Sequence, residues 1–230
     1  MRVLALIPAK AHSRRLPGKN IKPLAGQPLF MHGVRVALAA TEIDQVYVSS
    51  DSPEILAMVS DEGVGGLLRP PRLCTDDATN FQVMCHHLSE WRKAGQEPDI
   101  LVLLQPTTPF RTAQGLDTII RRFAADLDAD SAITVVSTAR VHGRLEAGYW
   151  VPEQSATTPF CRMQAEGNRL EATGHAILLR PRVTLDHGSL LGERILPELL
   201  PTGWLDIDID TSSDWELAQA YAKGVMEKIT

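Results

Sequence analysis

The residues best suited to chemistry gather in one short segment near the amino end of the chain. Val3–Ile7 is a continuous apolar run of the kind that forms a buried strand. The segment that follows is rich in cations, and its polar members are Lys10, Ser13, Arg14, Arg15, Lys19 and Asn20. A cationic loop at the end of a strand is well placed to surround a polyphosphate. This segment therefore points to a nucleotide ligand.

The spacing of this loop matches neither a Walker P-loop nor a dinucleotide-binding fingerprint. Phosphate binding must therefore rest on its cationic and hydroxyl side chains together with loop amides. Such groups can also stabilise a pyrophosphate leaving group. The alternative is a solvated basic loop, against which Leu16–Gly18 and Asn20 argue, because they indicate a fixed backbone shape.

A second cluster, Asp206–Asp210, alternates acidic and aliphatic residues near the carboxyl end. In a strand, successive side chains point to opposite faces, so Ile207 and Ile209 face one side and the three carboxylates the other. Like charges on one ridge repel each other and require a counter-ion. Mg²⁺ suits these oxygen ligands, since it usually binds one or two carboxylates plus substrate phosphates. The alternative is an exposed edge strand with its acidic residues outward.

Further polar residues follow other strand-like runs. Ser50-Asp51 comes after one run, and Gln105–Arg111 comes after another. The amide of Gln105 could read a base or a sugar hydroxyl, and Arg111 either holds a carboxylate or supports the loop. Arg69 and the nearby Thr75–Asp77 could border a base pocket.

Strand-like and helix-like segments alternate along the chain, which favours a Rossmann-like α/β fold with three layers, α/β/α, and a mostly parallel sheet. In such a sheet ligands bind beyond the carboxyl ends of the strands, where the polar clusters would meet. The expected strands are residues 3–7, 45–49, 67–68, 100–104, 132–136, 176–179 and 204–210. The expected helices are residues 28–40, 53–62, 79–94, 112–123 and 211–228.

Residues 142–171 break the alternation, with many glycines, prolines and polar residues. They could form a protruding β-arm, a lid or an interface. We expect one domain over residues 1–230, with 142–171 inserted in it as a small arm.

Composition excludes several classes of protein. The net charge of −5 provides no basic field for nucleic acid. No apolar stretch approaches the roughly 18 to 20 residues that span a bilayer. The three cysteines, Cys74, Cys85 and Cys161, form no CxxC pair and indicate a reducing compartment. We also expect no signal peptide, no membrane partner and a cytoplasmic location.

Read together, these segments resemble the acylneuraminate cytidylyltransferase family, which comprises the CMP-sialic acid synthetases and related CMP-sugar-acid synthetases. The family pattern I-P-A-R-x-x-S-K-x-x-P-x-K-N is similar to Ile7–Asn20, and Q-P-T-[ST]-P-[LF]-R is similar to Gln105–Arg111. The L-R-P-x-x-L-x-x-D stretch is matched by Arg69-Pro70 followed by Leu73–Asp76. The closing D-I-D-x-x-x-D element is matched from Asp208 to Asp214.

This resemblance implies a reaction: the anomeric hydroxyl of a nonulosonic or related 2-keto sugar acid attacks the α-phosphorus of CTP, giving a CMP-sugar and pyrophosphate. Asp208 and Asp210 would hold Mg²⁺, while Lys19 and Arg14 would stabilise the departing pyrophosphate. Gln105 and Arg162 would lie near the sugar acid. It also implies a homodimer in which the arm reaches the partner. The expected nucleotide-binding residues are Ala9, Lys10, Ser13, Asn20, Arg69 and Asp76.

Two departures from the family pattern matter. Lys10 replaces an Arg, which keeps the charge but loses the bidentate fork. Glu171–Leu178 replaces the R-P-N-G-A-I-Y-I of many sialic acid enzymes, so the sugar is inferred only as a class. The alternative functions are a nucleotide-diphosphate-sugar glycosyltransferase and a non-catalytic nucleotide-binding relative.

Overall fold

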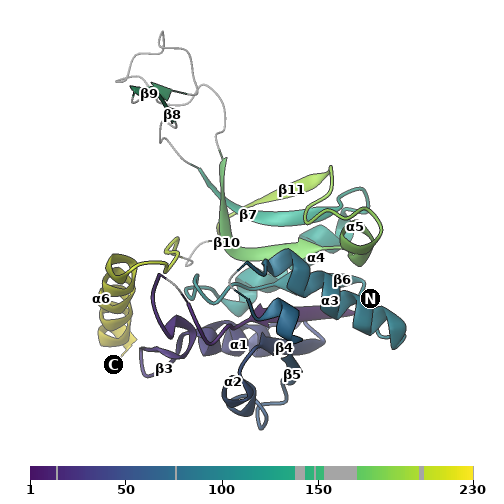
Figure 1. The fold of residues 1–230 in the computed structure, drawn as a ribbon, viewed down its shortest axis with the longest axis horizontal. Coiled ribbons are helices and arrows are strands. Elements are labelled where there is room, and N and C mark those ends of the chain that lie inside the picture. Colours follow the sequence, from purple (N-terminus) through teal and green to yellow (C-terminus); the bar gives the residue numbers. More distant parts are fainter. Residues whose placement is uncertain are drawn as a thin grey trace.

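The computed structural model of the chain describes residues 1–13, 15–75, 77–137, 143–147, 149–152, 170–201 and 205–229. They form an α/β fold around a seven-stranded sheet, as the alternation of segments predicts (Figure 1). Across the sheet the order is β11 (Ile195–Leu199), β7 (Ser131–Ser137), β10 (Leu170–Leu179), β6 (Ile100–Leu103), β1 (Val3–Pro8), β4 (Gln45–Ser50) and β5 (Gly65–Leu68).

The helices alternate with the strands along the chain. They are α1 (Leu29–Ala39), α2 (Pro53–Ala57), α3 (Asn80–Lys93), α4 (Ala113–Ala125), α5 (Pro181–Leu185) and α6 (Ser212–Ile229). Two 3₁₀ turns, η1 (Lys19–Ile21) and η2 (Pro71–Leu73), and a short strand pair, β2 (Pro23–Leu24) and β3 (Gln27–Pro28), lie between them.

The sheet is mostly parallel, as expected. β1 pairs in parallel with β4 and β6, β4 with β5, and β7 with β11. β10 runs antiparallel between β6 and β7. The exception has a simple cause: the chain leaves β7 at Ser137 and re-enters the sheet at Leu170, directly opposite it. Strands joined as the legs of a hairpin run in opposite directions.

The segment between β7 and β10 is the one in which the arm is expected. β8 (Gly143–Glu146) and β9 (Tyr149–Pro152) pair with each other there, and Figure 1 shows them apart from the seven-stranded sheet. Residues 142, 148 and 153–169 of the expected arm lie outside the described residues. The role of the arm in dimerisation stays a prediction.

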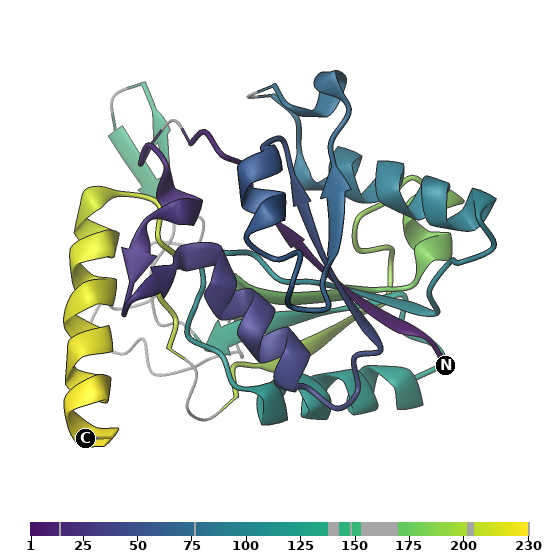
Figure 2. The same ribbon diagram turned by 90° about the horizontal axis from the view of Figure 1, so that it is seen from below.

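Helices cover both faces of the sheet. Along β1, Val3, Ala5 and Ile7 pack with residues of α1 and α4, whereas Leu4 and Leu6 pack with residues of α3. Figure 2 shows α1 and α4 on one side of the sheet and α3 and α5 on the other. Because β1 is buried on both faces, it reads as a continuous apolar run.

A third apolar cluster joins the two ends of the chain. Trp215 and Ala218 of α6 pack with Leu16 of the cationic loop and with Ile207 and Ile209. Figure 2 shows α6 on the side of the molecule toward which β1 runs. The cluster therefore holds the amino-terminal loop and the acidic segment against one helix.

Several expectations about the elements were wrong. β10 begins at Leu170, inside the expected arm, rather than at residue 176, and α5 was not predicted. Residues 205–210 form no strand of the sheet, although they bond to the loop after β6 through the amides of Leu205 and Ile209. The expected alternation persists there, with Ile207 and Ile209 buried. β11 was not predicted. The second helix ends at Ala57 rather than residue 62, because a turn follows it.

Among the described residues, no helix has the length and the apolar character needed to cross a membrane.

We predict that Trp215→Ala detaches the acidic segment from the body of the protein. The indole is 3% exposed, and its removal leaves a cavity in the third cluster. Loss of a buried Trp typically lowers the free energy of unfolding by about 3 to 5 kcal/mol. Urea unfolding followed by circular dichroism measures it. Leu217→Ala on the same helix, where the side chain is 58% exposed, is the control and should change stability little. Equal losses in both variants would contradict this role.

Candidate active site

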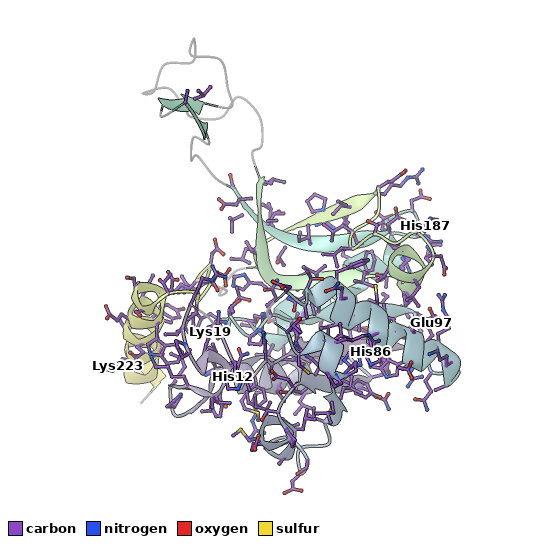
Figure 3. All side chains as sticks on the ribbon, in the orientation of Figure 1. His12, Lys19, His86, Glu97, His187 and Lys223 are labelled. Carbon is purple, nitrogen blue, oxygen red and sulfur yellow. The ribbon has the colours of Figure 1, made fainter. Side chains whose placement is uncertain are left out.

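A cleft of about 450 Å³ lies where the polar clusters meet. It is lined by Pro8, Lys10, His12, Ser13, Arg15, Lys19, Asn20, Asn80, Gln105, Pro106, Thr107, Asp208 and Asp210. The cationic loop and the aspartates, almost 200 positions apart, thus share one cleft, as the carboxyl-end argument predicts. Figure 3 shows His12 and Lys19 on the side of the molecule that carries α6, away from Glu97 and His187.

Lys19 is the link between the two ends of the chain. Its ammonium donates to the backbone oxygen of Ile209 at 2.7 Å and to Oδ1 of Asp210 at 2.9 Å. The side chain is 8% exposed, so these bonds form in a largely dry environment. Gly18, with φ of 65°, begins the 3₁₀ turn that carries Lys19, a conformation that favours glycine.

Asp210 is clamped by two cations. Arg15 Nη1 lies 2.8 Å from Oδ2, and Lys19 holds the other oxygen. Behind it, the carboxylate of Asp214 accepts from the amides of Asp210 and Thr211 and from the Thr211 hydroxyl. These bonds, the hydroxyl first, hold the pKa of Asp214 below its usual value. The amide of Asp214 also donates to the Thr211 hydroxyl at 3.3 Å, and this reciprocal cap fixes Asp210 at the start of α6.

Hydrogen bonds to neighbouring strands fix the course of the cationic loop. The amide of Ala9 donates to the backbone oxygen of Ser49 at 2.8 Å, and the amide of Ala11 donates to Oδ1 of Asp51 at 2.7 Å. The side-chain amide of Asn20 donates to the backbone oxygen of Lys10 at 2.7 Å. The loop therefore has a defined shape, and the alternative of a merely solvated basic segment is not supported.

Arg69 is 6% exposed and does not line the cleft. Its Nε donates to the hydroxyl of Ser49 at 3.0 Å and its Nη2 to the Ser49 backbone oxygen at 3.1 Å. The Ser49 hydroxyl also bonds Nε2 of His87 at 2.8 Å. Because Ser49 in turn accepts the amide of Ala9, this buried network supports the loop from beneath. The nucleotide contact expected of Arg69 stays a prediction.

Gln105 lines the cleft, and Arg111 supports its loop from inside the protein. Arg111 Nη2 donates to the backbone oxygen of Gln105 and to the hydroxyl of Thr108. Its Nε and Nη1 have no partner among the described residues, and complete burial lowers the pKa of the guanidinium to about 9. Of the two roles expected for Arg111, the geometry favours loop support. A Cβ on Gly174 would come within 3.2 Å of Gln105 Cδ, so the glycine admits this side chain.

Some lining residues were missed by sequence reasoning, and some expected residues fall outside the described ones. Thr107, from the expected Gln105–Arg111 cluster, lines the cleft, and so does Asn80, which was not singled out. Thr79 and Gln82 form a capping box that begins α3 at Asn80, and this T-x-x-Q spacing was the available signal. The expected site residues that lie outside the described part of the chain are Arg14, Asp76 and Arg162.

The donor set of the cleft fits a hard cation. Asp208 is exposed and has no hydrogen bond or ion pair within the described residues. Among those residues, no group of three or more His, Cys, Asp or Glu side chains could hold a metal ion. An ion at Asp208 and Asp210 would need further oxygens from a ligand. Mg²⁺ binds in this way, through one or two carboxylates and substrate phosphates.

Comparisons with known proteins show which proteins the chain resembles. The model of the family described as cytidylyltransferase matches residues 4–146. CMP-N,N'-diacetyllegionaminic acid synthase of Legionella pneumophila is 28% identical over 95% of this chain and 95% of that protein. N-acylneuraminate cytidylyltransferase of Escherichia coli is 36% identical over 48% of this chain, which spans only 25% of that longer protein.

The fold recurs in a solved structure. CMP:2-keto-3-deoxy-manno-octonic acid synthetase, in a structure titled as complexed with CTP, superposes with a TM-score of 0.71. The likeness covers 97% of this chain and 99% of that one at 19% identity. At this identity the likeness shows a shared fold.

We predict that the protein loses stability as the pH falls from 6.5 to 4. Burial, followed by smaller effects of neighbouring cations, lowers the pKa of His87 and of His175 to about 4. The unfolded chain takes up these protons near pH 6.5, so it binds more protons than the folded chain in this window. Each histidine then lowers the free energy of unfolding by roughly 3 kcal/mol at the acid end.

Urea unfolding at a series of pH values measures this dependence. His87→Gln keeps a hydrogen-bonding partner for Ser49 but removes one of the two buried histidines. Between pH 6.5 and 4 its free energy of unfolding should therefore fall about half as much as that of the wild type. His187→Gln, at an exposed position, is the control and should keep the wild-type slope. A wild-type slope in the His87 variant would contradict the assignment.

Proposed function

This chain belongs to the cytidylyltransferase family, and on that premise we propose that it joins CTP to a nonulosonic, sialic-acid-like 2-keto sugar acid, giving a CMP-sugar and pyrophosphate. One observation carries the proposal: the cationic loop and the aspartates face each other across a single cleft, joined by Lys19 and Asp210. Such a site can neutralise a triphosphate with the cations of the loop on one side and, on the other, with a metal ion held by the aspartates.

The nucleotide is proposed to lie along the cationic loop. Lys10, Ser13 and Asn20 line the cleft and would contact the phosphates or the ribose. The amide of Ala9 already donates to the backbone oxygen of Ser49, so a contact of Ala9 with the nucleotide would come from its own backbone oxygen. Arg69 and Asp76 are proposed near the base.

The reaction forms one bond to phosphorus and breaks another. The anomeric oxygen of the sugar acid attacks the α-phosphorus of CTP, and the bond to the bridging oxygen of the β-phosphate breaks. Negative charge then grows on the departing pyrophosphate. The ammonium of Lys19 is fixed by Ile209 and Asp210. It is proposed to stabilise that charge, and Arg14 is proposed to assist it.

We propose Mg²⁺ as the cofactor, held by Asp208 and Asp210. When bound, it would neutralise phosphate charge and polarise the α-phosphoryl group. The acidic residues are suited to this task by their alternation, since the buried Ile207 and Ile209 anchor the backbone while Asp208 is exposed and Asp210 lines the cleft.

The sugar acid is proposed to bind at the far end of the cleft from the phosphates, beside Gln105. The relatives named above act on diacetyllegionaminic and N-acylneuraminic acids, which are nonulosonic acids. Gln105 lines the cleft and its amide can bind sugar hydroxyls, while Arg162 is proposed to pair with the carboxylate.

We also propose a homodimer in the cytoplasm. An isolated two-stranded hairpin is marginally stable in water, so β8 and β9 need a surface to pack against. Because these strands lie apart from the seven-stranded sheet of their own chain, a partner subunit is the proposed surface (Figure 1).

The direct test is incubation with CTP, Mg²⁺ and a panel of sialic, legionaminic, pseudaminic and octulosonic acids. We expect pyrophosphate release with at least one nonulosonic acid and none without sugar, because the hydroxyl is the nucleophile. UDP- and GDP-sugars are the comparison set and should not be consumed. Release of a nucleoside diphosphate from them would favour a glycosyltransferase, and CTP binding without any product would favour a non-catalytic relative.

We predict that Asp208→Asn and Asp210→Asn each lower kcat by at least about 100-fold, the usual scale for losing an electrostatic stabiliser of the transition state. The fold should persist, as judged by circular dichroism. Asp206→Asn is the matched control, because this exposed aspartate lies in the same segment but does not line the cleft. Unchanged rates in both cleft variants would remove the metal assignment.

A further inference from the structure

The two cations that clamp Asp210 are held very differently. Lys19 is 8% exposed and also bonds the backbone oxygen of Ile209, so it is anchored independently of the carboxylate. Arg15 is 68% exposed, and among the described residues its guanidinium pairs with Asp210 alone. A solvent-exposed ion pair of this kind contributes little to stability and separates easily. Arg15 is therefore the movable member of the clamp.

The clamp leaves Asp210 without a free oxygen. Oδ1 accepts from Lys19 and Oδ2 from Arg15, whereas the neighbouring Asp208 has neither kind of partner in the described part of the chain. A divalent cation on Oδ2 would lie beside the guanidinium, and like charges repel each other. Arg15 and a metal ion would therefore compete for Oδ2 of Asp210.

Arg15 lines the cleft in which the triphosphate is proposed to bind. Once released from Asp210, its planar guanidinium can bind two phosphate oxygens at once. We propose that Arg15 is the counter-ion of Asp210 in the empty site, that it yields Oδ2 when metal and nucleotide bind, and that it then grips the terminal phosphates. This assignment rests on the proposed function and gives Arg15 a place in the reaction that no comparison assigns.

The exchange predicts opposite effects of one substitution on two ligands. In Arg15→Ala, Asp210 loses its mobile counter-ion, so Mn²⁺ alone should bind about threefold more tightly. Pyrophosphate at saturating Mg²⁺ should bind about tenfold more weakly, because a charge-assisted contact is lost. Electron paramagnetic resonance measures free Mn²⁺, and calorimetry measures pyrophosphate binding. Both measurements use the full chain without a sugar substrate.

Two further variants sharpen the test. Arg15→Lys keeps the charge without the fork, so Mn²⁺ affinity should stay near wild type while pyrophosphate binds with intermediate affinity. Arg35→Ala is the matched control: this exposed arginine pairs with Glu62 at 2.6 Å outside the cleft, and neither affinity should change.

Unchanged or weaker Mn²⁺ binding in Arg15→Ala would overturn the proposal, as would unchanged pyrophosphate binding. Failure of this inference is distinguishable from failure of the proposed function. If only the inference fails, the wild-type protein still releases pyrophosphate from CTP with the sugar panel, but the two affinities of Arg15→Ala do not change in opposite directions. If the proposed function fails, the wild-type protein releases no pyrophosphate at all.

Discussion

The site depends on a single buried contact between the two ends of the chain, from the ammonium of Lys19 to the backbone oxygen of Ile209 and the carboxylate of Asp210. The cationic loop carries a concentration of positive charge, and the acidic segment carries negative charge. Each segment therefore supplies counter-charge to the other. Lys19 joins them where water is largely excluded, and the remaining cleft residues are arranged around that contact.

Apolar packing holds this electrostatic contact in place. The indole of Trp215 covers Ile207 and Ile209 from one side, and Leu16 brings the cationic loop into the same cluster. A charged pair gains little at a fully solvated surface, so the cluster is what gives the contact its low-dielectric setting. From the other side, Ser49 of β4 joins the loop to Arg69, which follows β5, and to His87 of α3. The site is thus supported by an apolar cluster on one side and by a buried hydrogen-bond network on the other.

Much of this arrangement could be predicted from local patterns, and the errors have physical causes. β1 and β6 are buried on both faces, so they appear as unbroken apolar runs and were found. β11 escaped because Ile195–Leu199 contains a proline and a glutamate and has exposed leucine and isoleucine side chains. Residues 205–210 alternate like a strand, yet they bond to the loop after β6 rather than to a sheet strand. An alternating pattern predicts which side chains are buried, but it does not predict which segment of the backbone forms the hydrogen bonds.

By itself, the sequence determined the mostly parallel α/β fold, the cationic loop and the alternating aspartates, because each depends on residues that are neighbours in the chain. Only the tertiary structure decided that Arg69 and Arg111 face inward as supports, that Asn80 and Thr107 enter the cleft, and that Arg15 and Lys19 share Asp210. These facts depend on which elements pack together, and for Lys19 and Asp210 these elements lie 191 residues apart in the chain. No local spacing encodes such distances, since burial and ion pairing are properties of the packed chain.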